Sequence, residues 1–264
     1  MNLSFYTPIA YDYKYAIATI LSYYKIADEI ILGIDEDNIS WSHMKYNFDE
    51  ADFNARIVKI DTEKKIKIVK SNFHDAPLPM TNDTNERNYL THFCKRGNFI
   101  IGIDSDEVLL NPDTFKIWMN TMQPTADIKC KLFTVYKNFG DKLLNVEPDE
   151  MTTIGTTKVH CYTMCRNTDT KIKTLTINSP LEILHFSWAR NEQEMWQKLK
   201  NWGHSADFDI NKYFLLWKSA TLENYKTMTM LHPLGMKANW THLSLIDLSK
   251  YNLSEELLKE IKAF

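Results

Sequence analysis

The most informative stretch of the chain runs Asn98-Phe99-Ile100-Ile101-Gly102-Ile103-Asp104-Ser105-Asp106-Glu107. Its first part is almost entirely apolar, which is typical of a central strand that is buried on both faces of a parallel sheet. Two aspartates follow directly, and ligands of open parallel sheets bind beyond the carboxyl ends of the strands. The stretch therefore predicts an α/β fold with a ligand site beside Asp104 and Asp106.

Strand and helix signals alternate around this stretch, which is the order expected of a mostly parallel sheet with helices on its faces. Apolar runs predict strands at residues 3–7, 29–34, 55–60 and 98–103. Apolar residues at helical spacing predict helices at residues 12–24, 84–96, 112–122, 191–203 and 254–261. We expect one Rossmann-like α/β domain over residues 1–208 and a helical extension, residues 209–264, packed on the same domain.

The composition sets limits on the partners of the chain. It has 264 residues with 31 basic and 34 acidic side chains, so its formal charge of −3 gives no global attraction to phosphate polymers or anionic lipid. No apolar stretch approaches the ~20 residues that span a bilayer. The first residues lack the basic segment and apolar core of a secretory signal. We therefore expect a cytoplasmic protein without a membrane span.

The paired aspartates point to a metal ion. Asp104 and Asp106 repel each other and resist desolvation beside a dry core, and a divalent cation would offset both costs. Carboxylate oxygens suit Mg²⁺ or Mn²⁺, which keep positions open for phosphate oxygens. An isolated Asp-x-Asp is also common in exposed loops, where its side chains are simply solvated. The buried strand before it and the helix predicted after Pro112 favour the metal site.

These residues resemble the Asp-x-Asp motif of glycosyltransferases of the GT-A class, close to the family 2 type. The resemblance covers roughly the first 205 residues and rests on the order and spacing of several short matches. By position, the family's nucleotide-sugar contacts fall on Thr7, Pro8, Tyr11, Asp35, Arg87, Asn88, Asp104 and Ser105. The resemblance implies that the loop after the first strand and the acidic residue after the second contact the nucleotide.

A later block, residues 184–190, resembles a subset of these enzymes in which a late histidine completes the metal site. In that interpretation Asp104, Asp106 and His185 hold Mn²⁺ or Mg²⁺, and Arg190 pairs with the diphosphate of the donor. Imidazole suits Mn²⁺ better than Mg²⁺. The alternatives are a structural histidine that is hydrogen-bonded to a carbonyl and an exposed, ion-pairing arginine.

The general base is the weakest part of the match. Inverting enzymes of this class need a carboxylate near the acceptor hydroxyl, and Asp149 and Glu150 are the nearest candidates. Acidic residues around Pro148 are equally expected in an ordinary exposed turn. The usual acceptor-side motif is absent, so the sequence leaves inversion and retention both open.

The sequence thus predicts a glycosyltransferase with a UDP-sugar as the expected donor. Its acceptor is a hydroxyl of a saccharide, a protein or a modified nucleic acid, and its oligomeric state is left open. A nucleotidyltransferase also uses paired aspartates and metal ions, but residues 7–11 have no glycine-rich or basic phosphate loop. A third alternative is a non-catalytic protein that binds nucleotide sugars, against which the intact aspartate pair argues.

Overall fold

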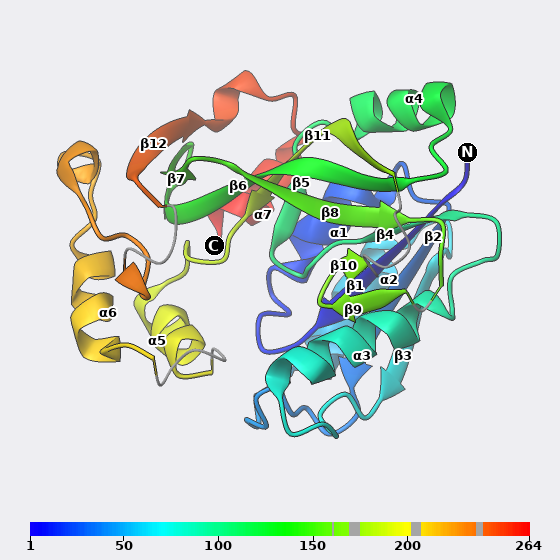
Figure 1. Ribbon diagram of the computed structural model, residues 1–264, viewed down its shortest axis with the longest axis horizontal. Helices are drawn as coiled ribbons and strands as arrows, with labels where there is room; N and C mark the ends of the chain where they lie inside the picture. The colour runs from blue at the N-terminus through cyan, green and yellow to red at the C-terminus, as the bar shows by residue number, and fades with distance from the viewer. Residues whose placement is uncertain (160, 169–174, 202–206, 236–239) are drawn as a thin grey trace.

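The computed structural model describes the whole chain except residues 160, 169–174, 202–206 and 236–239 (Figure 1). Its helices are α1 (Ala16–Tyr24), α2 (Glu50–Ile60), α3 (Pro79–Thr91), α4 (Pro112–Met122), α5 (Glu192–Asn201), α6 (Ile210–Lys218) and α7 (Glu255–Lys262). Its strands are β1 (Leu3–Ile9), β2 (Glu29–Asp35), β3 (Ile66–Ser71), β4 (Phe99–Gly102), β5 (Glu107–Leu109), β6 (Asp127–Phe139), β7 (Lys142–Glu147), β8 (Glu150–Thr156), β9 (Tyr162–Met164), β10 (Asn167–Thr168), β11 (Thr176–His185) and β12 (His242–Asp247).

The central sheet has a parallel half and a mixed half. Strands β3, β2, β1 and β4 lie side by side in this order and all run parallel. Beyond β4 the sheet continues through β8, β6, β7 and β12, which pair antiparallel. Strand β11 pairs parallel with β6 and antiparallel with β5. The expected α/β fold is confirmed, and the carboxyl ends of β1, β2 and β4 meet at one edge of the sheet.

Helices cover both faces of the parallel half (Figure 1). Side chains alternate between the two faces along a strand. Phe5 of β1 and Ile30 of β2 pack into a core with α1, α2 and α4. Their neighbours Tyr6 and Ile31 point to the other face, where they pack with Leu90 of α3. The α3 layer therefore lies directly over the strands whose ends form the candidate site.

Residues 55–60, expected as a strand, belong to helix α2. Asp49 caps this helix, since its side chain accepts a hydrogen bond of 3.0 Å from the backbone N–H of Asp52. Phe53 and Ile57, four residues apart, are the buried side chains of the helix. The apolar run at residues 55–60 is too short to distinguish a strand from a helix. The Asp49 cap and the helical spacing of Phe53 and Ile57 favour the helix. The third strand is instead β3.

Helix α3 begins at Pro79, five residues before the expected start at Thr84. Proline is favoured at the first helical position because its missing N–H has no partner there. Thr84 lies inside the helix and donates to the carbonyl of Met80 over 2.7 Å, so it is no cap. The extra turn brings further polar side chains, including Asn82 and Asp83, onto the buried face of the helix.

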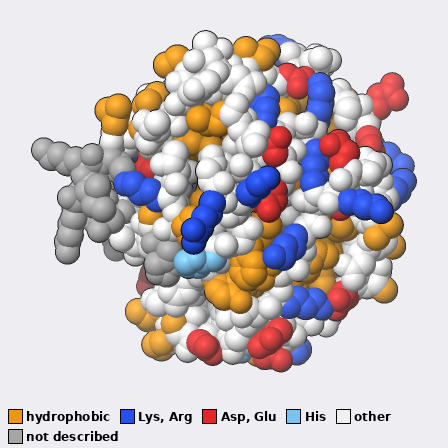
Figure 2. Space-filling model, turned by 90° about the vertical axis from the view of Figure 1, so that its right-hand side faces the viewer, with side chains coloured by type: hydrophobic (Ala, Val, Ile, Leu, Met, Phe, Trp, Pro, Cys, Tyr) orange, Lys and Arg blue, Asp and Glu red, His pale blue; other side chains and the backbone are white. Residues whose placement is uncertain are grey.

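The segment expected to be a helical extension is only partly helical. It contains α6 and α7, but β12 pairs antiparallel with β7 and extends the sheet of the preceding residues. No helix in the described part of the chain is long and apolar enough to cross a membrane. On the face in Figure 2, acidic and basic side chains are interspersed, in keeping with the small net charge.

Candidate active site

A cavity of about 580 Å³ lies among the loops that follow β1, β2 and β4. Its lining includes six of the predicted site residues: Pro8, Tyr11, Asp104, Ser105, Asp106 and His185. It also includes residues that the sequence did not single out as site residues, among them Asp12, Trp41, Asp83, Glu86 and Lys198. The structure thus brings the Asp-x-Asp loop and the late histidine into one cavity, at the edge of the sheet where the sequence placed them.

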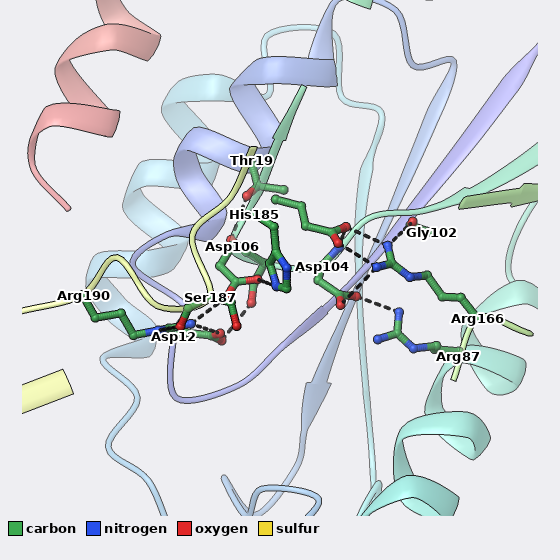
Figure 3. Close-up of polar contacts among 12 residues, drawn as sticks. Asp12, Thr19, Arg87, Gly102, Asp104, Asp106, Arg166, His185, Ser187 and Arg190 are labelled. Carbon is green, nitrogen blue, oxygen red and sulfur yellow. Dashed lines mark hydrogen bonds and ion pairs between the residues drawn. The ribbon is translucent and has the colours of Figure 1, made fainter. Parts of the chain in front are cut away.

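Cations flank the two aspartates from opposite sides (Figure 3). On one side, Arg87 of α3 donates from Nη1 to Asp104 Oδ1 over 2.7 Å. Arg166 Nη2 lies 3.8 Å from Asp104 Oδ2. Burial acts to raise the pKa of Asp104, but Arg87 and Arg166 outweigh it and hold that pKa well below its usual value. Asp104 is therefore ionised, and Arg87, which is not among the residues that line the cavity, pairs with it.

A largely buried ion pair fixes the loop behind Asp104. Arg166 binds Glu107 through both ends of its guanidinium group, over 2.7 Å and 2.6 Å. Glu107 Oε2 also accepts the backbone N–H of Asp104 over 2.9 Å. Bidentate arginine–carboxylate pairs of this kind combine strength with fixed geometry. Arg166 lies between β9 and β10, and no feature of the sequence pointed to it.

On the other side, Arg190 holds Asp106. Its Nη2 lies 2.6 Å from Asp106 Oδ2 and 3.3 Å from Asp12 Oδ2, and its side chain is almost completely buried. Asp12 in turn accepts a hydrogen bond from Ser105 Oγ over 2.8 Å. Arg190 thus links two carboxylates from a buried position, and its expected pairing with a diphosphate stays a prediction.

Asp106 and His185 face each other as two ligands of one ion would. His185 Nε2 lies 3.5 Å from Asp106 Oδ1. Nitrogen and oxygen donors each about 2.1 Å from a shared ion lie about 3.0–3.5 Å apart. The arrangement is set by the sheet, because His185 ends β11 opposite Glu107 of β5.

Asp106 and His185 are thus the two described side chains that fit a shared metal ion. Within the described residues, no three His, Cys, Asp or Glu side chains surround a common point. Arg87 bonds Oδ1 of Asp104 and leaves its Oδ2, so the role of Asp104 as a third metal ligand stays a prediction. An ion bound by Asp106 and His185 would have most of its coordination positions filled by phosphate oxygens and water, as is common for Mg²⁺ at nucleotide sites.

Lys198 of α5 adds a cation to the cavity wall. Burial, together with the nearby Arg190, lowers the pKa of Lys198 to about 8. A lysine ammonium group is a compact point charge that suits a phosphate oxygen. The sequence placed Lys198 after the histidine block, but did not name it as a site residue.

Three of the predicted nucleotide contacts form hydrogen bonds within the protein. Thr7 Oγ1 lies 2.9 Å from the hydroxyl of Tyr23 in the core. Asn88 bonds the backbone N–H and carbonyl of Tyr162, both over 2.9 Å, and so anchors β9. Both carboxylate oxygens of Asp35 are used within the loops after β2 and β3, where they bond Asp37, Ile39, Phe73 and His74. The end of β2 therefore offers the cavity no free carboxylate at Asp35.

The predicted catalytic carboxylates lie outside the cavity. Asp149 Oδ2 pairs with Lys131 Nζ over 2.7 Å, and its other oxygen accepts a hydrogen bond from Asn145. Glu150 Oε1 accepts the indole N–H of Trp240 over 3.3 Å. Asp149 lies in the connection between β7 and β8, and Glu150 is the first residue of β8. The structure gives neither of them a place among the cavity-lining residues.

No protein-family model and no curated protein sequence matches this chain. Among solved structures, a 4-diphosphocytidyl-2C-methyl-D-erythritol synthase is similar at TM-score 0.39 and 11% identity, over 68% of this chain and 88% of the other. A 2-C-methyl-D-erythritol 4-phosphate cytidylyltransferase from Francisella tularensis gives TM-score 0.30 and 10% identity, over 83% and 87%. A mannose-1-phosphate geranyltransferase from Thermus thermophilus gives 0.27 and 8%, over 85% and 67%. Likeness at this level identifies neither the family nor the activity of the chain.

Proposed function

We propose that the chain is a metal-dependent glycosyltransferase that takes its sugar from a nucleotide-sugar donor. The observation that carries this proposal is the mixed chemistry of a single cavity. Asp106, His185 and Lys198 give it donors for a metal ion and a phosphate, while Trp41 and Met80 give it aromatic and apolar surface. Such a cavity suits a ligand with a charged diphosphate and a flat ring.

Each charged side chain of the cavity has its own role in this proposal. A bound Mn²⁺ or Mg²⁺, held by Asp106 and His185, would neutralise the charge of the diphosphate leaving group. Lys198 places a second positive charge on the same wall of the cavity. Arg190 keeps Asp106 ionised and oriented, since burial opposes its ionisation but His185 and Arg190 lower its pKa. Asp104, fixed by Arg87, offers its remaining oxygen to a hydroxyl of the ribose or sugar.

Product analysis separates this proposal from the nucleotidyltransferase alternative. A glycosyltransferase releases a nucleoside diphosphate from a nucleotide sugar, whereas a nucleotidyltransferase releases pyrophosphate from a nucleoside triphosphate. We expect UDP-sugars to raise the melting temperature only when Mn²⁺ is present, and to be hydrolysed slowly to UDP. Release of pyrophosphate from triphosphates, with no effect of nucleotide sugars, would replace the proposal by the alternative. Binding of nucleotide sugars without any turnover would favour a non-catalytic binding protein.

A further inference from the structure

Two buried polar side chains hold Trp41 at the cavity. Its indole N–H donates to Glu86 Oε2 over 2.6 Å, and its backbone carbonyl accepts Asn82 Nδ2 over 3.0 Å. Asn82 and Glu86 lie four residues apart on α3, on the same helix face. Both are almost completely buried, whereas Trp41 itself is partly exposed at the cavity. Two buried side chains thus fix both the backbone and the ring of one aromatic residue in a loop.

Gly33 leaves the space that the Glu86 carboxyl group occupies. A Cβ atom at Gly33 of β2 would lie 2.8 Å from Glu86 Oε1 and 2.7 Å from Leu90 Cδ1. The missing side chain lets the carboxyl group settle against the sheet, where Oε1 has no hydrogen-bond partner among the described residues. Burial raises the pKa of Glu86 to about 8, so at neutral pH it is an uncharged acid whose Oε2 accepts a hydrogen bond from the indole N–H.

The position of Trp41 relative to the charged groups suits one kind of ligand. It lies in the loop after β2, while Asp106 follows β4, and β1 lies between these strands. With strands about 4.8 Å apart, the two loops are separated by roughly 10 Å. Arg87 lies between them, since it pairs with Asp104 and its guanidinium carbon is 5.8 Å from the centroid of the Trp41 ring. A ligand whose phosphates lie at Asp106 and Lys198 would bring a ring to Trp41.

We propose that Trp41 is the residue on which the base of the nucleotide stacks, and that Glu86 is a positioning residue that fixes the plane of its indole. This inference rests on the proposed function and adds to it the means by which the base is held. Because every base has a π-face, stacking is tolerant of the identity of the base. Trp41 therefore contributes affinity for nucleoside diphosphates in general.

Binding of two probes, each with Mn²⁺, separates the base from the phosphates. The probes are UDP, which has a base, and pyrophosphate, which has none. We expect Trp41→Ala to weaken UDP binding by about 10-fold or more and to leave pyrophosphate binding unchanged. Trp41→Phe should keep most of the affinity because it keeps an aromatic face. Trp196→Ala is the matched control, since Trp196 is partly exposed but lies outside this cavity.

Glu86 is tested with two variants of similar size. Glu86→Gln keeps an acceptor for the indole N–H, so we expect nearly wild-type affinity for UDP. Glu86→Leu removes the acceptor, and we expect part of the loss seen with Trp41→Ala, again with no change for pyrophosphate. The melting temperature of each variant without ligand shows whether it is folded. A Glu86→Leu protein that is folded and binds UDP like wild type would remove Glu86 from the inference.

The outcomes distinguish this inference from the proposed function. If wild-type protein binds UDP and pyrophosphate but folded Trp41→Ala and Trp41→Phe bind both as tightly, the inference is wrong and the proposed function stands. Equal weakening of both probes would also overturn it, because Trp41 would then support the site as a whole. If wild-type protein binds none of UDP, CDP, GDP and ADP in the presence of Mn²⁺, both are wrong.

Discussion

Arg190 Nη2 lies 2.6 Å from Asp106 Oδ2, so the aspartate best placed to hold a metal ion is already paired with a buried cation. The same nitrogen reaches Asp12 at 3.3 Å. Two carboxylates thus share one guanidinium group at the wall of the cavity. Lys198 lies near both carboxylates as a second cation, and a metal ion beside His185 would add to this positive charge.

Loss of the Arg190 charge is expected to destabilise the protein strongly. Arg190→Met removes the guanidinium group that pairs with the buried Asp106 and with Asp12, and breaking a buried ion pair in this way costs about 3–5 kcal/mol. Urea denaturation of the variant and of wild type measures the change. We expect Mn²⁺ to restore more stability to Arg190→Met than it adds to wild type, because the ion takes the vacated place. An unchanged free energy of unfolding would mean that Arg190 is not a structural clamp.

Asp106 and His185 are expected to act as one unit in binding metal. Asp106→Asn removes one charge and little volume, so it should abolish Mn²⁺-dependent binding of UDP while the protein stays folded. His185→Ala should cause the same kind of loss rather than a general drop in stability. Calorimetric titration with Mn²⁺ and UDP measures both, with the exposed Asp113→Asn as control. Unaltered metal dependence in either variant would take that residue out of the metal site.

What the sequence predicted well is local along the chain. The apolar run before Asp104 and the acidic residues after it occupy consecutive positions, so both the strand and its carboxyl-terminal site are visible in one window. His185 was found for the same reason, since it closes the apolar run of β11. The structure confirms that both lie in one cavity. Their function as metal ligands remains a prediction.

What the sequence missed depends on contacts between distant segments. Arg190 lies 84 residues from Asp106, and Arg166 lies 59 residues from Glu107. Nothing in their neighbourhood indicates that each is buried against a carboxylate. The same holds for Asp35, whose carboxylate bonds Phe73 and His74 after β3. Among these features, the run of polar residues in α3 is the one that could indicate a buried polar network from the sequence.

Gly33 gives a steric test of the α3 layer. Its hypothetical Cβ atom comes within 2.9 Å of Leu90 and Glu86 side-chain atoms, closer than any real contact permits. We expect Gly33→Ala to cost about 1–3 kcal/mol, the usual range for overpacking, and to weaken UDP binding by displacing Glu86. The double variant with Leu90→Ala should recover part of the stability if the contact is responsible. Wild-type stability of the single variant would show that the ends of the Leu90 and Glu86 side chains give way to the added methyl group.

The proton on Glu86 should make stability depend on pH in a defined direction. Burial raises its pKa from 4.5 to about 8, with Trp41 bonded to it and Asp83, Arg87 and Asp35 as the nearest charges. The folded protein therefore keeps a proton that the unfolded chain releases, so this group's contribution to the free energy of unfolding falls as the pH rises from about 4.5 to about 8 and is flat above. Glu86→Gln cannot titrate. Its stability relative to wild type should rise across this window, by at most about 5 kcal/mol at 1.36 kcal/mol per pKa unit. Urea denaturation of both proteins at about pH 5 and about pH 8.5 measures the difference. A constant difference would mean that Glu86 is charged throughout and that the indole of Trp41 is held by a carboxylate.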